Sequence, residues 1–142
     1  MNQITCTRRI QFCAGHRVPR HESKCRNLHG HNYVAFFTAS APKLDDRGRV
    51  IDFGVLKERI GGWIDKNWDH GMVLQHTDPM RPIYEDEFKG HKLFTMGEPP
   101  TAECMADYLL REVCPLTLSG TGVTVTKVVL WETENCYAEA VL

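Results

Sequence analysis

Three histidines near the N-terminus limit what this chain can fold into more than any other feature. His16 lies in the segment Phe12–Arg17, and His29 and His31 lie two residues apart in the segment Cys25–Tyr33. Side chains at i and i+2 of a strand point to the same face of a sheet. A strand through His29 and His31, beside a second strand that ends near His16, would place three imidazoles together. Such a group could bind a borderline metal such as zinc.

The histidine pair by itself is a weak signal, because most such pairs are solvated or hydrogen-bonded. The addition of His16 on a second predicted strand, and of the nearby thiol of Cys25, favours a metal site. Three protein ligands leave one coordination position open, which is the catalytic arrangement. The alternative is a structural zinc site that includes Cys25. Structural sites favour Cys-x2-Cys pairs, however, and the six cysteines of this chain contain none.

Length, charge and composition narrow the class of protein. A chain of 142 residues, 42% hydrophobic and 25% charged, is expected to form one globular domain over residues 1–142. Its net charge of −1 argues against a protein built to bind duplex nucleic acid. The first residues lack the pattern of a signal peptide, and no apolar stretch approaches the length of a membrane span. We therefore expect a cytoplasmic protein with reduced cysteines and with no nucleic-acid or membrane partner.

The spacing of apolar residues predicts an α+β fold. Strands are expected over 3–14, 31–41, 123–132 and 136–142, and helices over 53–67 and from 101 to Cys114-Pro115. Asp52 and Thr101 are the expected N-caps, and segment 75–98 is expected to be irregular apart from strand character at 92–96. This order predicts an antiparallel four-stranded sheet with two helices on one face. The other face and the strand edges then need a partner, so we expect a homo-oligomer.

Seven motifs occur in order along the chain: Phe12-x-Ala14-x-His16-Arg17, Cys25-x3-His29-Gly30-His31-Asn32-Tyr33, Asp52-Phe53, Leu56-Lys57, Asp69-His70, Pro100-Thr101-Ala102-Glu103 and Trp131-Glu132-Thr133. Together they resemble the 6-pyruvoyl-tetrahydropterin synthase superfamily nearly end to end. The short Cys-x3-His spacing is similar to the carboxy-forming branch of that superfamily, the 6-carboxytetrahydropterin synthases of the 7-deazaguanine (queuosine precursor) pathway. The resemblance implies a tunnelling fold (T-fold), in which trimers close a β-barrel and two trimers stack into a hexamer.

The resemblance also implies which residues hold the metal and move protons. Zinc would be held by three histidines: His16, His29 and His31. A thiolate base and a proton-relay pair would be the catalytic residues: Cys25, Asp69 and His70. A carboxylate beside an imidazole can fix the tautomer of the ring and raise its basicity. The alternatives are an inert loop cysteine and a helix-terminal histidine beside a solvated aspartate.

Glu132 resembles the pterin anchor of the family. A carboxylate can accept two parallel hydrogen bonds from the N–H and NH2 edge of the pterin ring; Glu134 and Glu139 are the alternatives. Further residues fall in matching positions: Thr133, Glu103 and Thr101. Glu103 could instead simply complement a helix N-terminus.

The function implied by the resemblance is that of a Zn2+-dependent lyase. It would convert 7,8-dihydroneopterin triphosphate into 6-carboxy-5,6,7,8-tetrahydropterin, acetaldehyde and triphosphate. One alternative is the pyruvoyl-forming reaction, which uses the same residues, and another is a non-catalytic pterin- or zinc-binding module. Basic side chains near the metal motif are a hypothesis for triphosphate binding: Arg9, Arg17, His21, Lys24 and Arg26.

Overall fold

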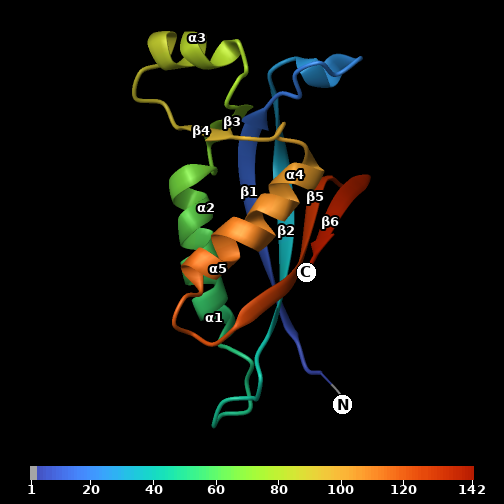
Figure 1. Ribbon diagram of the computed structural model, residues 1–142, viewed down its shortest axis with the longest axis vertical. Coiled ribbons are helices and arrows are strands. Elements are labelled where there is room, and N and C mark those ends of the chain that lie inside the picture. Colours follow the sequence, from blue (N-terminus) through green and yellow to red (C-terminus); the bar gives the residue numbers. More distant parts are fainter. Residues whose placement is uncertain (1–2) are drawn as a thin grey trace.

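A six-stranded mixed sheet forms the centre of the computed structural model, which describes residues 3–142. The order of the strands is β4-β3-β1-β2-β5-β6, and the helices of the main layer cover one face (Figure 1). The strands are Cys6–His16 (β1), His29–Ser40 (β2), Gly71–Gln75 (β3), Leu93–Met96 (β4), Thr124–Thr133 (β5) and Cys136–Val141 (β6). The predicted α+β class is therefore confirmed.

The predicted sheet of four antiparallel strands is wrong in its details. The short strands β3 and β4 extend the sheet beyond β1, and the pairs β1–β3 and β3–β4 are parallel. Parallel neighbours need a crossover connection. Helix α2 (Gly62–Asn67) precedes β3, and helix α3 (Met80–Glu87) connects β3 to β4. Ala14 of β1 pairs with Gly71 of β3. These residues are far apart in the sequence, so no local sequence pattern predicts the β1–β3 pairing.

Two long helices pack on the sheet, and each contains a π-helical segment. The first runs through α1 (Phe53–Leu56), residues 57–61 and α2, as predicted for residues 53–67. The second runs through α4 (Ala102–Tyr108), residues 109–113 and α5 (Cys114–Thr117). The predicted stop at Cys114-Pro115 is wrong. Pro115 lies within this continuous helix, just after the π-helical segment of residues 109–113.

Alternation along β1 and β2 builds the core. Phe12 and Ala14 of β1 and Tyr33 and Phe37 of β2 point to the helices and are buried. The helices contribute the facing apolar stripe: Leu56, Ile60, Ile64, Met105, Leu109, Leu110 and Val113. Burial of each large side chain contributes about 1.5–3 kcal/mol to folding. His16 continues the buried face of β1 and is only 1% exposed, so the histidine motif lies at the end of the core.

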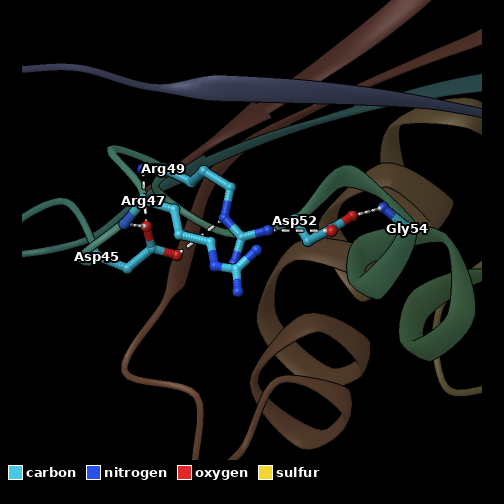
Figure 2. Close-up of polar contacts among 5 residues, drawn as sticks. All are labelled: Asp45, Arg47, Arg49, Asp52 and Gly54. Carbon is cyan, nitrogen blue, oxygen red and sulfur yellow. Dashed lines mark hydrogen bonds and ion pairs between the residues drawn. The ribbon is translucent and has the colours of Figure 1, made fainter.

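A polar network fixes the start of α1 (Figure 2). The carboxylate of Asp52 accepts a hydrogen bond from Gly54 N at 2.7 Å, which confirms the predicted N-cap. Arg49 donates to Asp52 Oδ2 at 3.2 Å and to Asp45 Oδ2 at 3.0 Å. Asp45 Oδ1 also accepts from the N–H groups of Arg47 and Arg49, each at 2.9 Å. The loop before α1 is thereby tied to the first turn of the helix.

Helix α3 was not predicted, whereas strand character at residues 92–96 is confirmed by β4. None of the residues of α3 is buried, and the helix is only eight residues long with Pro82 near its start, so the helical spacing of Met80, Ile83 and Tyr84 is too short a signal to predict it. Figure 1 places α3 and the loop of residues 17–28 at the same end of the molecule, opposite the N-terminus. Across residues 3–142, no helix combines the length and the apolar character that crossing a membrane requires.

Candidate metal centre and active site

The three histidines of the predicted metal motif meet at the end of the β1–β2 hairpin. His16 pairs with His29 in the strand register, and His31 follows on the same face of β2. The ring centroids of the three side chains lie 4.5, 5.1 and 4.9 Å apart. One ring nitrogen from each residue lies within 4.8 Å of the other two, so the three imidazoles can hold one metal ion.

Backbone carbonyl groups orient two of these rings. His16 Nδ1 donates to Pro100 O at 2.7 Å, and His29 Nδ1 donates to Asn27 O at 2.7 Å. Because a carbonyl oxygen can only accept, each Nδ1 carries the proton and each Nε2 has a free lone pair. The two Nε2 atoms nevertheless lie 3.0 Å apart. Two facing lone pairs repel each other, and a cation between or beside them removes that repulsion.

His31 supports the same interpretation. Its Nε2 is buried and makes no hydrogen bond, although Glu132 Oε1 lies 3.2 Å away. The distance suits an ion pair, but no hydrogen bond forms, which indicates an unfavourable angle. A buried nitrogen without a partner is expensive, so the donor set of the three histidines fits a resident metal ion.

Burial favours the neutral form of two of these imidazoles, those of His16 and His31. Desolvation lowers the pKa of His16 to about 4; the bond to Pro100 opposes this shift, and the other two histidines add to it. Desolvation also lowers the pKa of His31, while the negative charge of Glu132 acts in the opposite direction. Neutral imidazole is the form that binds metals.

Glu132 and Tyr33 form the inner wall of this site. Glu132 shares the buried face of β5 with Leu130, and its side chain is 21% exposed. The hydroxyl of Tyr33 is buried without a hydrogen-bond partner. Burial raises the pKa of Tyr33, and so does the charge of Glu132. Tyr33 falls within the histidine motif, but a tyrosine in an apolar strand looks like an ordinary core residue, so the sequence alone does not mark it as a site residue.

Thr133, Thr101 and Glu103 lie outside the histidine cluster. Thr133 Oγ1 accepts from Asn135 N at 3.2 Å in the β5–β6 turn. Thr101 Oγ1 accepts from Cys104 N at 3.1 Å and is the predicted N-cap of α4. Glu103 is exposed in the first turn of that helix. The adjacent Pro100, which the sequence analysis did not select, is the residue that links the start of α4 to the metal motif.

Asp69 and His70 lie in the turn between α2 and β3. His70 Nδ1 lies 3.0 Å from Asp69 Oδ2, and the His70 side chain is 79% exposed. Asp69 Oδ1 accepts from Cys13 N at 3.0 Å, and His70 N donates to Cys13 O at 2.7 Å. His70 has a positive φ of 60°, which is uncommon for a residue other than glycine and is often found at functional sites.

Hydrogen bonds keep Asp69 ionised. Partial burial alone would raise its pKa. The hydrogen bonds from Cys13 N–H and from His70, with the positive charges of His70 and Lys92, outweigh that effect and lower the pKa. An ionised Asp69 can hold the ring of His70 in one orientation and stabilise its protonated form.

Cys25 lies in a short 3₁₀ turn, Lys24–Arg26, of the loop between β1 and β2. Among residues 3–142, it belongs to neither cluster of potential metal ligands. The thiol that lies within 4.8 Å of the Asp69 and His70 ligand atoms is that of Cys13. The structure of one chain therefore does not bring together Cys25, Asp69 and His70.

Comparisons with known proteins agree with this geometry. A family model described as 6-pyruvoyl tetrahydropterin synthase matches residues 5–141. A protein of Rickettsia bellii named 6-carboxy-5,6,7,8-tetrahydropterin synthase is 40% identical over 136 residues, which cover 96% of this chain and 99% of the relative. A protein of Aquifex aeolicus with the same name is 34% identical over 152 residues and covers 92% of this chain and 93% of its own.

Solved structures show the same fold. A crystal structure of an uncharacterized protein from Wolinella succinogenes has a TM-score of 0.83 at 24% identity and covers 99% of both chains. The 6-pyruvoyl tetrahydropterin synthase of Caenorhabditis elegans has a TM-score of 0.70 at 24% identity and covers 100% of this chain and 97% of its own. These matches confirm the predicted T-fold for the single chain, and the sequence matches to named enzymes extend over nearly the whole chain. We conclude that the chain is an enzyme of the 6-pyruvoyl tetrahydropterin synthase family.

Proposed function

We propose that the protein is a zinc-dependent lyase that converts 7,8-dihydroneopterin triphosphate into 6-carboxy-5,6,7,8-tetrahydropterin, acetaldehyde and triphosphate, a step of 7-deazaguanine (queuosine) biosynthesis. The observation that carries the proposal is the convergence of His16, His29 and His31, with two Nε2 lone pairs facing each other, beside Glu132. The relatives from Rickettsia bellii and Aquifex aeolicus that are named after this product support its identity.

Each proposed site residue has a distinct task. When bound, zinc supplies a Lewis acid that makes a carbon-bound proton of the substrate side chain easier to remove. Glu132, at the end of β5, accepts hydrogen bonds from the pterin edge and so orients the ring. Cys25 accepts a proton as thiolate, and His70, oriented by Asp69, donates and accepts protons during the tautomerisation.

Thr133, Thr101 and Glu103 complete the proposed substrate site. Thr133, next to Glu132, contributes a hydroxyl close to the ring-binding carboxylate. Thr101 positions the start of α4, and with it Pro100, which orients His16. The exposed carboxylate of Glu103 is available to substrate only at the surface of α4. Of these three residues, Thr133 is the best placed to contact the substrate directly.

A complete site of this kind needs more than one copy of the chain. His16 lies three residues after Cys13 on β1, so the two side chains point to opposite faces of the sheet. The histidine cluster is on the helix-covered face, whereas the Asp69–His70 pair lies beside Cys13. We therefore propose a homo-oligomer, a trimer or a hexamer, in which His70 of one copy serves the metal site of another.

Product analysis tests the proposed reaction. The zinc-loaded protein is incubated with 7,8-dihydroneopterin triphosphate, and the products are identified by mass spectrometry. Carboxytetrahydropterin and acetaldehyde support the proposal. Formation of pyruvoyltetrahydropterin would instead assign the protein the pyruvoyl-forming reaction, after which the Caenorhabditis elegans relative is named. Unchanged substrate with intact protein and bound zinc would make a non-catalytic pterin- and zinc-binding module the better account.

The thiol variants distinguish an enzyme from a binding module. Cys25→Ala should abolish turnover and leave zinc content unchanged. Cys104→Ala is the matched control, because Cys104 is also half-buried but lies on α4. Equal activity of the two variants would rule out Cys25 as the base. Light scattering of the same samples measures the oligomeric state, and a monomer would contradict the proposed shared site.

A further inference from the structure

A second group of metal-binding side chains lies outside the histidine cluster. It consists of Cys13, Asp69 and His70, whose thiol, carboxylate and imidazole ligand atoms lie within 4.8 Å of one another. A thiol, an imidazole and a carboxylate are the three side-chain types that bind zinc in proteins. The group joins β1 to the turn before β3, so it exists only because those two segments are neighbours in the parallel pair.

The ligand atoms of this group are arranged nearly as they would be around a bound cation. Bonds of about 2.0–2.3 Å would place the ligand atoms of a tetrahedral zinc ion about 3.3–3.7 Å apart. Asp69 Oδ2 and His70 Nδ1 are already 3.0 Å apart. The thiol of Cys13 lies within 4.8 Å of these atoms and needs to approach them by about 1.5 Å at most, which a side-chain rotation provides.

The surroundings of the group leave room for a cation to enter. The His70 side chain is exposed, and Cys13 is half-buried. Both residues line an open pocket whose floor includes the backbone of Gly15 and Gly30. A Cβ atom at Gly30 would lie 3.2 Å from the carbonyl oxygen of Ala14, so the two strands approach closely there.

The backbone holds the three residues in place. The side chain of Asp69 and the N–H group of His70 bond to the N–H and C=O groups of Cys13, respectively. Lys92 donates to the carbonyl oxygen of Asp69, and its positive charge weakens any cation site nearby. A cation bound here would thus be held less tightly than one held by three neutral imidazoles.

We propose that Cys13, Asp69 and His70 form a second, weaker site for a thiophilic divalent cation such as zinc or cadmium, on the opposite face of the sheet from the three histidines. Binding displaces the proton of the Cys13 thiol to solvent, and the ring proton of His70 is carried on Nε2, so that a neutral imidazole binds the ion through Nδ1. The bound cation fixes the ring of His70. An excess of zinc should therefore inhibit turnover, a consequence that rests on the proposed function, whereas the binding itself does not.

A cadmium titration tests the site without any measurement of activity. Cd2+ is added to the zinc-loaded protein, and the ultraviolet charge-transfer band of a cadmium–thiolate bond is recorded. The three histidines contain no sulfur, so exchange of cadmium into their site gives no such band. We expect a band that saturates at one cadmium ion per chain and that is lost in Cys13→Ser.

Two control variants identify the thiol. Cys25→Ser and Cys104→Ser should keep the band, since neither residue belongs to the group. No band in the unaltered protein, a band that survives Cys13→Ser, or a band that requires Cys25 would each overturn the proposal. The last result would assign the cadmium to a site that includes the loop of residues 17–28.

A second variant tests the imidazole ligand and does not depend on Cys13. His70→Asn keeps a residue that tolerates positive φ but removes the ring nitrogen. Its cadmium affinity should fall roughly 10-fold or more, since even residues that only support metal ligands typically contribute 10–100-fold. An unchanged affinity, with an unchanged circular dichroism spectrum, would exclude His70 as a ligand and overturn the three-residue site.

Discussion

Arg17 Nε donates to Asp78 Oδ2 at 2.7 Å, and the side chain of Asp78 is 0% exposed. The same guanidinium donates to Arg26 O at 3.2 Å, next to Cys25. Asp78 Oδ1 accepts from Met80 N at 2.8 Å at the start of α3. This buried carboxylate therefore joins α3 to the loop that carries the proposed base. Arg17 is among the basic residues suggested for triphosphate binding, but its guanidinium is already bonded to Asp78 and to Arg26 O.

Removal of this carboxylate should destabilise the protein. Asp78→Ala leaves the partly buried Arg17, which is 19% exposed, without a partner, and it leaves Met80 N without an acceptor. We expect the free energy of unfolding to fall by about 3 kcal/mol, at the lower end of the range for a broken buried pair because Arg17 retains some solvent. Urea denaturation followed by circular dichroism measures the change.

The exposed pair of Asp107 and Arg111 is the matched control. Its contact is also 2.7 Å, but both side chains are about half exposed. Asp107→Ala should change the free energy of unfolding by less than about 1 kcal/mol. Equal effects of Asp78→Ala and Asp107→Ala would show that the buried pair has no special structural importance.

Loss of one histidine ligand should remove the metal and preserve the fold. His29 is partly exposed at the start of β2, so His29→Ala costs little packing. We expect the metal content of the purified protein to fall to nearly zero, while its far-ultraviolet circular dichroism stays unchanged. His91→Ala, at an exposed position outside both clusters, should retain the metal. Unfolding of His29→Ala, or of the chelated protein, would indicate a structural metal site instead.

Neutralisation of Glu132 should weaken substrate binding. Glu132→Gln keeps the shape of the side chain but removes the charge that accepts hydrogen bonds from the pterin edge. Hydrogen bonds to charged groups contribute about 1.5–3 kcal/mol, so kcat/KM should fall by roughly 10- to 100-fold. Glu139→Gln is the control, because Glu139 lies on β6 and only approaches Lys127 at 3.5 Å. Similar losses in both variants would exclude Glu132 as the specific anchor.

Burial should make the thiol of Cys114 unreactive towards alkylating reagents. Desolvation raises the pKa of Cys114 from 9.0 to about 12. In the folded protein Cys114 should resist alkylation at pH 9, whereas the exposed Cys136 reacts; mass spectrometry of the labelled peptides distinguishes them. Rapid labelling of native Cys114 would show that α5 opens easily.

The same shift predicts how stability changes in alkaline solution. Between pH 9 and 12 the unfolded state has released the Cys114 proton and the folded state has kept it. The unfolded state then binds fewer protons, so the free energy of unfolding falls as the pH rises, by at most about 1.4 kcal/mol per pH unit from this group. Below pH 9 the group has no effect. Denaturation of the parent protein and of Cys114→Ala over this range should give a shallower slope for the variant.

Local patterns in the sequence determined the positions of several elements and of the metal motif. Alternation along β1 and β2 placed His29 and His31 on one face. Apolar spacing marked the helix over residues 53–67, and Asp52 marked its first turn. These features follow from the period of two in a strand and of about 3.6 in a helix, which any stretch of sequence displays directly.

Contacts between distant segments were decided only by the tertiary structure. The parallel pairing of β1 with β3 places Cys13 beside Asp69 and His70, which are 56 and 57 residues away in the sequence. Helix α3 has no buried residue and is only eight residues long, so its short apolar spacing does not separate it from a loop. Arg17 is bound to Asp78 across 61 residues. No local period encodes which distant group a charged or thiol side chain will meet, because that depends on how the strands and helices pack.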